Sequence, residues 1–126
     1  MIKSKASLVS RTIKGRFNLK RLSDINCGYC YFWAWVFFNK YGGELYSVSY
    51  FGGHAFVRIY GKFYDAQNSY GVKDWRALAC FAFSNRENIP YDFAEHLTKK
   101  QFKKKMDNKD LTKRLTYGKL RETIER

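Results

Sequence analysis

The chain has 126 residues, of which 45% are apolar and 19% aromatic, and its formal net charge is +13. This length suits a single domain with a buried core, and the apolar content excludes an intrinsically disordered chain. Residues 1–22 hold seven Lys and Arg and no acidic residue, residues 23–97 hold six basic and seven acidic residues, and residues 98–126 hold eleven basic and four acidic residues. We therefore expect a basic N-terminal arm, a near-neutral core over residues 23–97 and a basic C-terminal helical segment.

The two basic flanks indicate the kind of partner. Clustered Lys and Arg attract polyanions, so nucleic acid, the ribosome and acidic protein surfaces are candidate partners. Solubility with unspecific polyanion affinity is the simpler alternative. No signal peptide is predicted, and the apolar run Tyr29–Phe38 has only ten residues, too few to span a bilayer. With three cysteines, which cannot all pair within one chain, we expect a cytoplasmic protein without membrane contact.

The first half of the chain predicts a helix followed by antiparallel strands. Residues 1–22 form either an arm or a short helix. Residues 28–41 are apolar nearly all round, which is typical of a helix buried on most sides, and Gly42-Gly43 supplies its C-terminal stop. Alternating, β-rich segments then predict three strands, at Leu45–Phe51, His54–Tyr60 and Lys62–Ala66, with a tight turn at Gly61 between the last two.

The second half of the chain predicts loops and helices. We expect a loop at Asn68–Gly71, a short helix at Asp74–Phe81 with Asp74 near its N-terminus, and a turn at Asn85–Pro90. Thr98-x-x-Gln101 has the spacing of a capping box and begins a lysine-rich helix with Phe102 and Met106 on one side. Leu111–Ile124 predicts a last helix. Because the strands are grouped rather than alternating with helices, the predicted class is α+β.

Three residues form a candidate catalytic constellation. Cys30 lies in the first turn of the predicted helix, where the helix N-terminus lowers a thiol pKa and outward-pointing N–H groups can hold an oxyanion. His54 and Asp65 lie on neighbouring strands, and a turn at Gly61 brings them to one sheet face at diagonal positions. The imidazole then activates the thiol, and the carboxylate fixes the imidazole tautomer. If these three side chains meet, they predict a nucleophilic thiol enzyme.

The sequence around the thiol resembles a known family. Cys27-Gly28-Tyr29-Cys30-Tyr31 is similar to the papain and cathepsin motif C-G-[SA]-C-[WY], with Tyr in place of Ser or Ala. This resemblance to the papain-like superfamily, over residues 22–80, implies that Cys30 is the nucleophile. In that family a glutamine six residues earlier stabilises the oxyanion, and this chain has Asp24 there. Asn26, four residues earlier, has the chemistry of a donor and is the favoured candidate.

The same resemblance implies a fold and further site residues. It implies a minimal papain-like fold, with a central buried helix packed on a small antiparallel sheet and with C-terminal helices, as in small bacterial and viral members. Gly52 and Gly53 leave room for a substrate beside the imidazole, and Trp75 is the third candidate for substrate binding. A viral member would act in the host cytoplasm.

Other kinds of site stay open. Cys27, Cys30, His54 and Cys80 offer the ligand types of a closed zinc tetrahedron. Cys27-x-x-Cys30 also has the spacing of a redox motif, without the βαβ pattern that usually surrounds one. Lysines on the predicted C-terminal helix could follow a phosphate backbone, namely Lys99, Lys100, Lys103, Lys104 and Lys105. His96, beside this helix, is expected at the surface.

Together these patterns predict a papain-like cysteine hydrolase or acyl transferase of the peptidase, amidase or deamidase type. It would act on an amide or isopeptide bond of an acidic protein or peptide, without a cofactor. Cys30 would be the nucleophile, His54 the base and then the acid, and Asp65 the orienting residue. The alternative is a non-catalytic basic binding or inhibitor protein on the same fold, of the kind that phages use in host takeover, which contacts nucleic acid or an acidic protein.

Overall fold

The fold is a five-stranded antiparallel sheet with helices packed on one face. The computed structural model describes residues 1–26, 28–49, 53–81 and 89–107. Its helices are α1 (Ile2–Phe17), α2 (Leu22–Asn26), α3 (Cys30–Tyr41) and α4 (Lys99–Asp107). Its strands are β1 (Glu44–Val48), β2 (His54–Ile59), β3 (Lys62–Asp65), β4 (Asn68–Val72) and β5 (Glu95–Leu97), in the sheet order β4-β3-β2-β1-β5. The predicted α+β class is confirmed.

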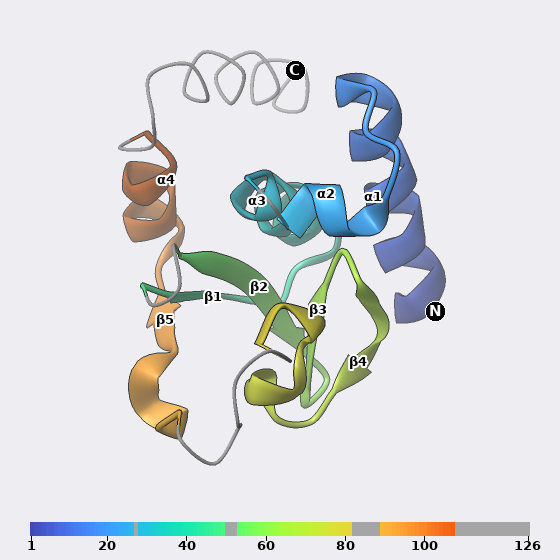
Figure 1. Ribbon diagram of the computed structural model, residues 1–126. Helices are drawn as coiled ribbons and strands as arrows, with labels where there is room; N and C mark the ends of the chain where they lie inside the picture. The colour runs from blue at the N-terminus through green and yellow to red at the C-terminus, as the bar shows by residue number, and fades with distance from the viewer. Residues whose placement is uncertain (27, 50–52, 82–88, 108–126) are drawn as a thin grey trace.

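Helix α3 is the centre of the larger core and lies between α1 and α4 over the sheet (Figure 1). Its residues from Cys30 to Phe37 are all buried, as the apolar pattern predicts. From one side α1 contributes Val9 and Ile13, and from the other side α4 contributes Phe102, whose ring stacks on Trp35 at 6.0 Å. Residues 2–17 are therefore a helix that belongs to the core, which confirms the helix alternative over the arm.

The opposite face of the sheet is covered by short 3-10 turns. The helix predicted at Asp74–Phe81 is instead two such turns, η1 (Trp75–Ala77) and η2 (Ala79–Phe81), separated by Leu78 in an extended conformation. Asp74 does lie at the start, where its carboxylate accepts the Arg76 N–H at 2.9 Å. Because 3-10 turns have three residues per turn, Trp75, Leu78 and Phe81 all point into the second core.

The loop predicted at Asn68–Gly71 is wrong, because these residues belong to the edge strand β4. Asn68 pairs with Asp65 and Val72 pairs with Phe63. An edge strand buries little, so it tolerates the Asn, Ser and Gly residues that otherwise indicate a turn. The sequence pattern also predicts neither α2 nor β5, because each is too short to show a period.

A tight turn joins β2 to β3 and fixes how these two strands pair. Tyr60 and Gly61 have φ values of 52° and 78°, and positive φ at both central residues is the signature of a type I′ turn. The resulting register pairs Val57 with Tyr64. The predicted turn at Gly61 is thus confirmed, and it sets which residues face each other at the far end of the hairpin.

Helix α4 begins with the predicted capping box. The Thr98 N–H donates to Gln101 Oε1 at 2.8 Å, and the Gln101 N–H donates to Thr98 Oγ1 at 3.1 Å. Phe102 and Met106 are buried on one side of the helix, as predicted. The predicted helix at Leu111–Ile124 and most of the predicted turn over residues 85–90 lie outside the described residues. Among the helices that the structure describes, none has the length and apolar character needed to cross a membrane.

Candidate active site

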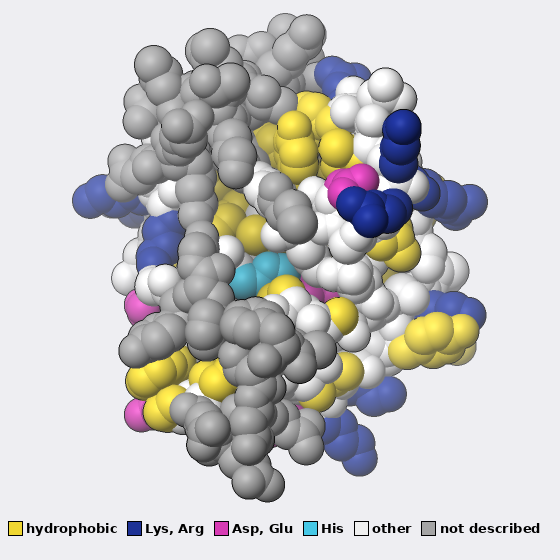
Figure 2. Space-filling view, viewed as in Figure 1, with side chains coloured by type: hydrophobic (Ala, Val, Ile, Leu, Met, Phe, Trp, Pro, Cys, Tyr) yellow, Lys and Arg dark blue, Asp and Glu magenta, His cyan; other side chains and the backbone are white. Residues whose placement is uncertain are grey.

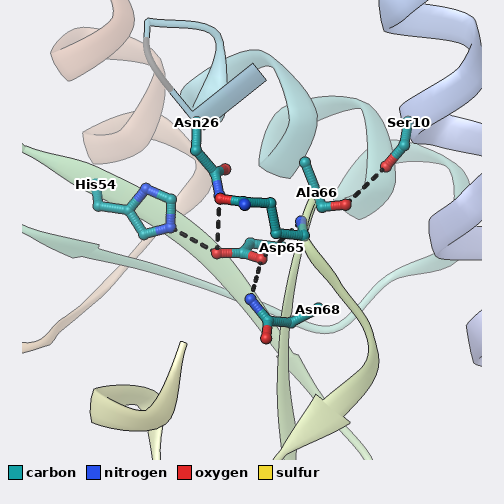
Figure 3. Close-up of polar contacts among 7 residues, drawn as sticks. Ser10, Asn26, His54, Asp65, Ala66 and Asn68 are labelled. Carbon is teal, nitrogen blue, oxygen red and sulfur yellow. Dashed lines mark hydrogen bonds and ion pairs between the residues drawn. The ribbon is translucent and has the colours of Figure 1, made fainter. Parts of the chain in front are cut away.

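Strands β2 and β3 place His54 and Asp65 at one end of the sheet. The last pair of the β2–β3 ladder is Val57 with Tyr64, and extending this register by one residue sets Asp65 against Phe56 and His54 diagonally across from Asp65. His54 Nε2 and Asp65 Oδ2 are 2.8 Å apart (Figure 3). Since a carboxylate only accepts, Nε2 is the donor. The predicted contact between these two residues on one sheet face is confirmed.

Helix α3 brings Cys30 to the same imidazole. Cys30 is the first residue of the helix, and its side chain hydrogen-bonds with that of His54. Cys30 and His54 are each 4% exposed. Because Nε2 is engaged with Asp65, Nδ1 is the ring nitrogen that can exchange a proton with the thiol. The three residues that the sequence indicates therefore meet around one buried imidazole.

The Asp65 carboxylate is held by further donors. Asn68 Nδ2 donates to Oδ1 at 2.7 Å, and the backbone N–H of Gln67 donates to the same oxygen at 3.0 Å. Asn26 Nδ2 donates to Oδ2 at 3.5 Å (Figure 3). Asp65 is 1% exposed. A carboxylate has acceptors only, so it satisfies all of these donors at once and keeps Oδ2 directed at His54.

The pKa of His54 is set by opposing effects. Burial by itself lowers this pKa, because a low-dielectric surrounding disfavours the imidazolium. Hydrogen bonds with Asp65, Cys30 and Cys80, together with the charge of a Cys30 thiolate, outweigh burial and raise the pKa of His54 well above its ordinary value. The site therefore stabilises the imidazolium, which is the form that pairs with a thiolate.

The two side chains predicted to hold the oxyanion are directed elsewhere. Asn26 Nδ2 donates to Gln67 Oε1 at 2.8 Å as well as to Asp65, so this amide supports the carboxylate. Asp24 accepts the backbone N–H of Arg21 at 3.0 Å and the Arg21 guanidinium at 3.3 Å. The backbone hydrogen bond from Arg21 lowers the pKa of Asp24. Asp24 is therefore ionised at neutral pH and has no proton to donate to an oxyanion.

The residues predicted to bind substrate have different environments. Trp75 is fully buried in the second core, where its ring stacks on Phe56 at 6.1 Å and its Nε1–H donates to the Tyr91 carbonyl at 2.9 Å. It cannot contact a substrate, because the 3-10 turn directs it at the sheet. Gly53 is half-buried and directly precedes His54, whereas Gly52 lies outside the described residues.

A second thiol reaches the imidazole. Cys80, in η2, also hydrogen-bonds with His54, and burial raises the pKa of this thiol. Of the predicted zinc ligands, His54 and Cys80 lie within 4.8 Å of each other in a group with Asp65, Cys30 is not part of this group, and Cys27 lies outside the described residues. The sequence indicates Cys80 only as a candidate zinc ligand with His54, and gives no sign that it lies beside Asp65.

Gln67 and Asn68, two of the donors to Asp65, are site residues that the sequence does not single out. Gln67 and Asn68 follow Asp65 by two and three residues, and Asp side chains often bind the backbone N–H two residues on. That local pattern is a usable signal for the Gln67 hydrogen bond. Asn26 is 39 residues away in the chain and has no such signal for its contact with Asp65.

Basic side chains lie at the surface away from the imidazole. Lys and Arg are arranged around the edge of the face that has a histidine near its centre (Figure 2). On α4, Lys99, Lys100, Lys103 and Lys104 are exposed and Lys105 is half-buried. His96 is exposed, as predicted, with Nε2 3.6 Å from Glu44 Oε2. Contact between these lysines and a phosphate backbone stays a prediction.

Comparison with protein families, with curated proteins and with solved structures finds no match to this chain. Membership of the papain-like superfamily therefore stays a prediction from the motif around Cys30. The proposed function therefore rests on the chemistry of the Cys30, His54 and Asp65 side chains.

Proposed function

We propose that this protein is a thiol hydrolase or acyl transferase that acts on amide or isopeptide bonds. The observation that carries the proposal is the buried His54 imidazole, which hydrogen-bonds with both Cys30 and Asp65. The distance from His54 Nε2 to Asp65 Oδ2 is 2.8 Å. Nucleophilic thiol catalysis needs three groups, and this site has all of them. They are a thiol at a helix start, an imidazole that favours its charged form, and a carboxylate that orients the imidazole.

In the proposed reaction, His54 Nδ1 takes the Cys30 proton and the thiolate attacks the substrate carbonyl carbon. The C–S bond forms while the carbonyl π pair moves to oxygen. The C–N bond then breaks as the imidazolium gives its proton to the leaving amine, which leaves a thioester on Cys30. Water, or an amine in a transferase, loses a proton to His54, attacks the thioester and releases the thiolate. Asp65 keeps the Nε2–H bonded throughout.

The oxyanion needs donors at the N-terminal end of α3. The N–H groups of a first helical turn point out of the helix end, where the dipole also favours negative charge. The backbone N–H of Cys30, the first residue of α3, is our candidate for this role. Asn26 would act as a positioning residue for Asp65.

The test of this function is the rate at which iodoacetamide alkylates Cys30 across pH, resolved by mass spectrometry in reduced protein. We expect fast labelling that persists below about pH 7, because an imidazolium partner keeps the thiol ionised below its ordinary pKa of about 8.5. An ordinary thiol is only about 1% ionised at about pH 6.5, so His54→Gln should slow labelling there by up to about 100-fold.

His96→Gln is the matched control, because it removes an exposed imidazole that lies outside the site. This variant should keep the wild-type pH profile. An ordinary thiol profile in the wild-type protein would remove the main support for catalysis.

A surface pocket beside the site supports the proposal that the substrate of this protein is acidic. It has a volume of about 230 Å³ and is lined by Arg11 and Lys14 of α1 together with three serine hydroxyls. One of these, Ser10, donates to the Ala66 carbonyl at 3.4 Å, so the pocket wall continues into the strand end that holds Asp65 (Figure 3). The two cations, with the hydroxyls of Ser7 and Ser69, suit a carboxylate or phosphate group of the target, whereas Ser10 already donates its proton to Ala66.

Reversing both charges, in Arg11→Glu with Lys14→Glu, should weaken binding of a Glu-rich peptide by about tenfold at low salt. The measurement is fluorescence anisotropy of the labelled peptide, repeated at higher salt, where the difference should shrink. The matched control is Lys103→Glu with Lys104→Glu, which changes net charge equally on the exposed face of α4. An equal or larger loss in the control would assign acidic partners to α4 instead of the pocket.

The second candidate function is a non-catalytic basic binding protein on the same fold. It is favoured by the shielding of the reaction centre, because Cys30 and His54 are each 4% exposed and a substrate must displace neighbouring side chains to reach them. In that case wild-type labelling would show no dependence on His54, and Cys30→Ala would keep full affinity for the acidic partner.

A further inference from the structure

Cys80 is a nucleophilic group that the proposed reaction does not use. It is a free, half-buried cysteine in η2, and its side chain hydrogen-bonds with His54. The next residue, Phe81, is buried and packs its ring edge-on to the His54 imidazole, with the ring centres 5.7 Å apart. The segment that carries the second thiol is therefore anchored against the site.

The ligand atoms of His54, Asp65 and Cys80 lie within 4.8 Å of one another. Around a tetrahedral zinc ion, nitrogen, oxygen and sulfur ligands at about 2.0–2.3 Å from the metal are about 3.3–3.6 Å apart. His54 Nε2 and Asp65 Oδ2, now 2.8 Å apart, would separate by about 0.5 Å, and the thiol would approach by about 1.5 Å at most. Small side-chain rotations are sufficient for these three ligand atoms to reach a tetrahedral zinc ion.

The donor set and its surroundings fit zinc better than a hard cation. A thiolate, an imidazole and a carboxylate are zinc ligands, whereas calcium and magnesium take oxygen. Ligating carboxylates are themselves held by hydrogen bonds from a second shell. Here Asn68 Nδ2 and the Gln67 N–H hold Asp65 Oδ1 and leave Oδ2 directed at His54.

We propose that His54, Asp65 and Cys80 bind a zinc ion, and that this ion switches off the Cys30 nucleophile. The ion takes the place of the Nε2 proton of the imidazolium, and this proton and the Cys80 thiol proton are released to water. The neutral imidazole keeps its single proton on Nδ1, so it can neither accept a proton from Cys30 nor supply the imidazolium charge that keeps Cys30 ionised. Zinc would thus remove the base without consuming the nucleophile. The switch rests on the proposed function, whereas the metal site does not.

Metal binding is measured first, with cobalt(II) as the spectroscopic probe and zinc in competition with a coloured chelator. Reduced wild-type protein should bind one equivalent of cobalt with a thiolate-to-cobalt charge-transfer band, and zinc should displace it. Cys80→Ser should lose the band and at least about 100-fold in zinc affinity, since a lost ligand costs more than a lost second-shell partner. Cys30→Ser should keep the band. A band that persists in Cys80→Ser, or disappears in Cys30→Ser, would overturn the site.

The switch is measured as zinc protection of Cys30 against iodoacetamide, expressed as the ratio of labelling rates without and with zinc in each variant. We expect strong protection in the wild-type protein and a ratio near one in Cys80→Ser. Equal protection in both proteins would overturn the role of Cys80. If cobalt binds as expected while Cys30 labels as an ordinary thiol even without metal, the site stands and the hydrolase proposal fails.

Discussion

Replacing Asp65 with Asn should slow the alkylation of Cys30 at about pH 6.5 by up to about 100-fold, close to the loss expected when His54 itself is removed. In the Ser-His-Asp arrangement, the same change lowers kcat by about 10⁴-fold, because the imidazole adopts the wrong tautomer. Amide hydrolysis, once a substrate is found, should fall at least as much. The measurement is the labelling rate across pH in wild-type and variant proteins.

The physical reason is the number of donors around this side chain. Gln67 N–H and Asn68 Nδ2 both point at Oδ1, and His54 and Asn26 both point at Oδ2. An amide has one acceptor oxygen and one donor group, so it must turn its NH₂ toward one of the two pairs. If the NH₂ faces His54, the imidazole proton moves to Nδ1 and the base is lost. If the NH₂ faces Asn68, it meets the Gln67 N–H and Asn68 Nδ2, which are also donors, so these groups lose their hydrogen bonds. The free energy of unfolding then falls by about 1–3 kcal/mol.

Two further variants distinguish orientation from a general loss of structure. Asp24→Asn is the matched control, because it removes a half-buried carboxylate that is held by Arg21 and Lys20 rather than by His54, and it should leave the labelling profile unchanged. Asn68→Asp added to Asp65→Asn restores an acceptor where the new NH₂ can donate, so the amide oxygen can face His54 again. We expect partial recovery of labelling in this double variant. An unchanged profile in Asp65→Asn would contradict the orienting role.

The His54–Asp65 contact is predictable from the sequence because local rules determine it. A two-residue turn around Gly61 fixes the register, and the alternation of a strand then puts both side chains on one face. Cys30 follows from the apolar helix that begins at it. The Asn26–Asp65 contact could not be predicted, because Asn26 reaches the site from α2, which has no periodic signal. Cys80 could be indicated beside His54 only by its type as a zinc ligand, because η2 has no periodic signal either.

The incorrect predictions share a physical cause, which is that short elements take their conformation from the sheet. The β4 residues resemble a turn in composition but pair along β3, where an edge position needs little burial. Trp75 is predicted on a short helix and as a substrate-binding residue, but the spacing of Trp75, Leu78 and Phe81 matches 3-10 turns that cover the sheet. Tertiary burial, rather than local propensity, decides both outcomes.

Trp75→Ala should therefore lower the free energy of unfolding by about 3–5 kcal/mol, the cost of removing a buried aromatic side chain. The Trp75 ring packs edge-on to Phe81 at 5.2 Å, and Phe81 in turn contacts His54, so His54-dependent labelling should also fall. Urea unfolding followed by circular dichroism measures the stability.

Two comparison variants separate the loss of the ring from other effects. Trp75→Phe, which keeps a ring but loses the hydrogen bond to the Tyr91 carbonyl, should lower the free energy of unfolding by about 1–2 kcal/mol. Tyr70→Ala, at a 70% exposed aromatic, should stay within about 0.5 kcal/mol of wild type. An unchanged urea midpoint in Trp75→Ala together with weaker substrate binding would return Trp75 to the substrate site.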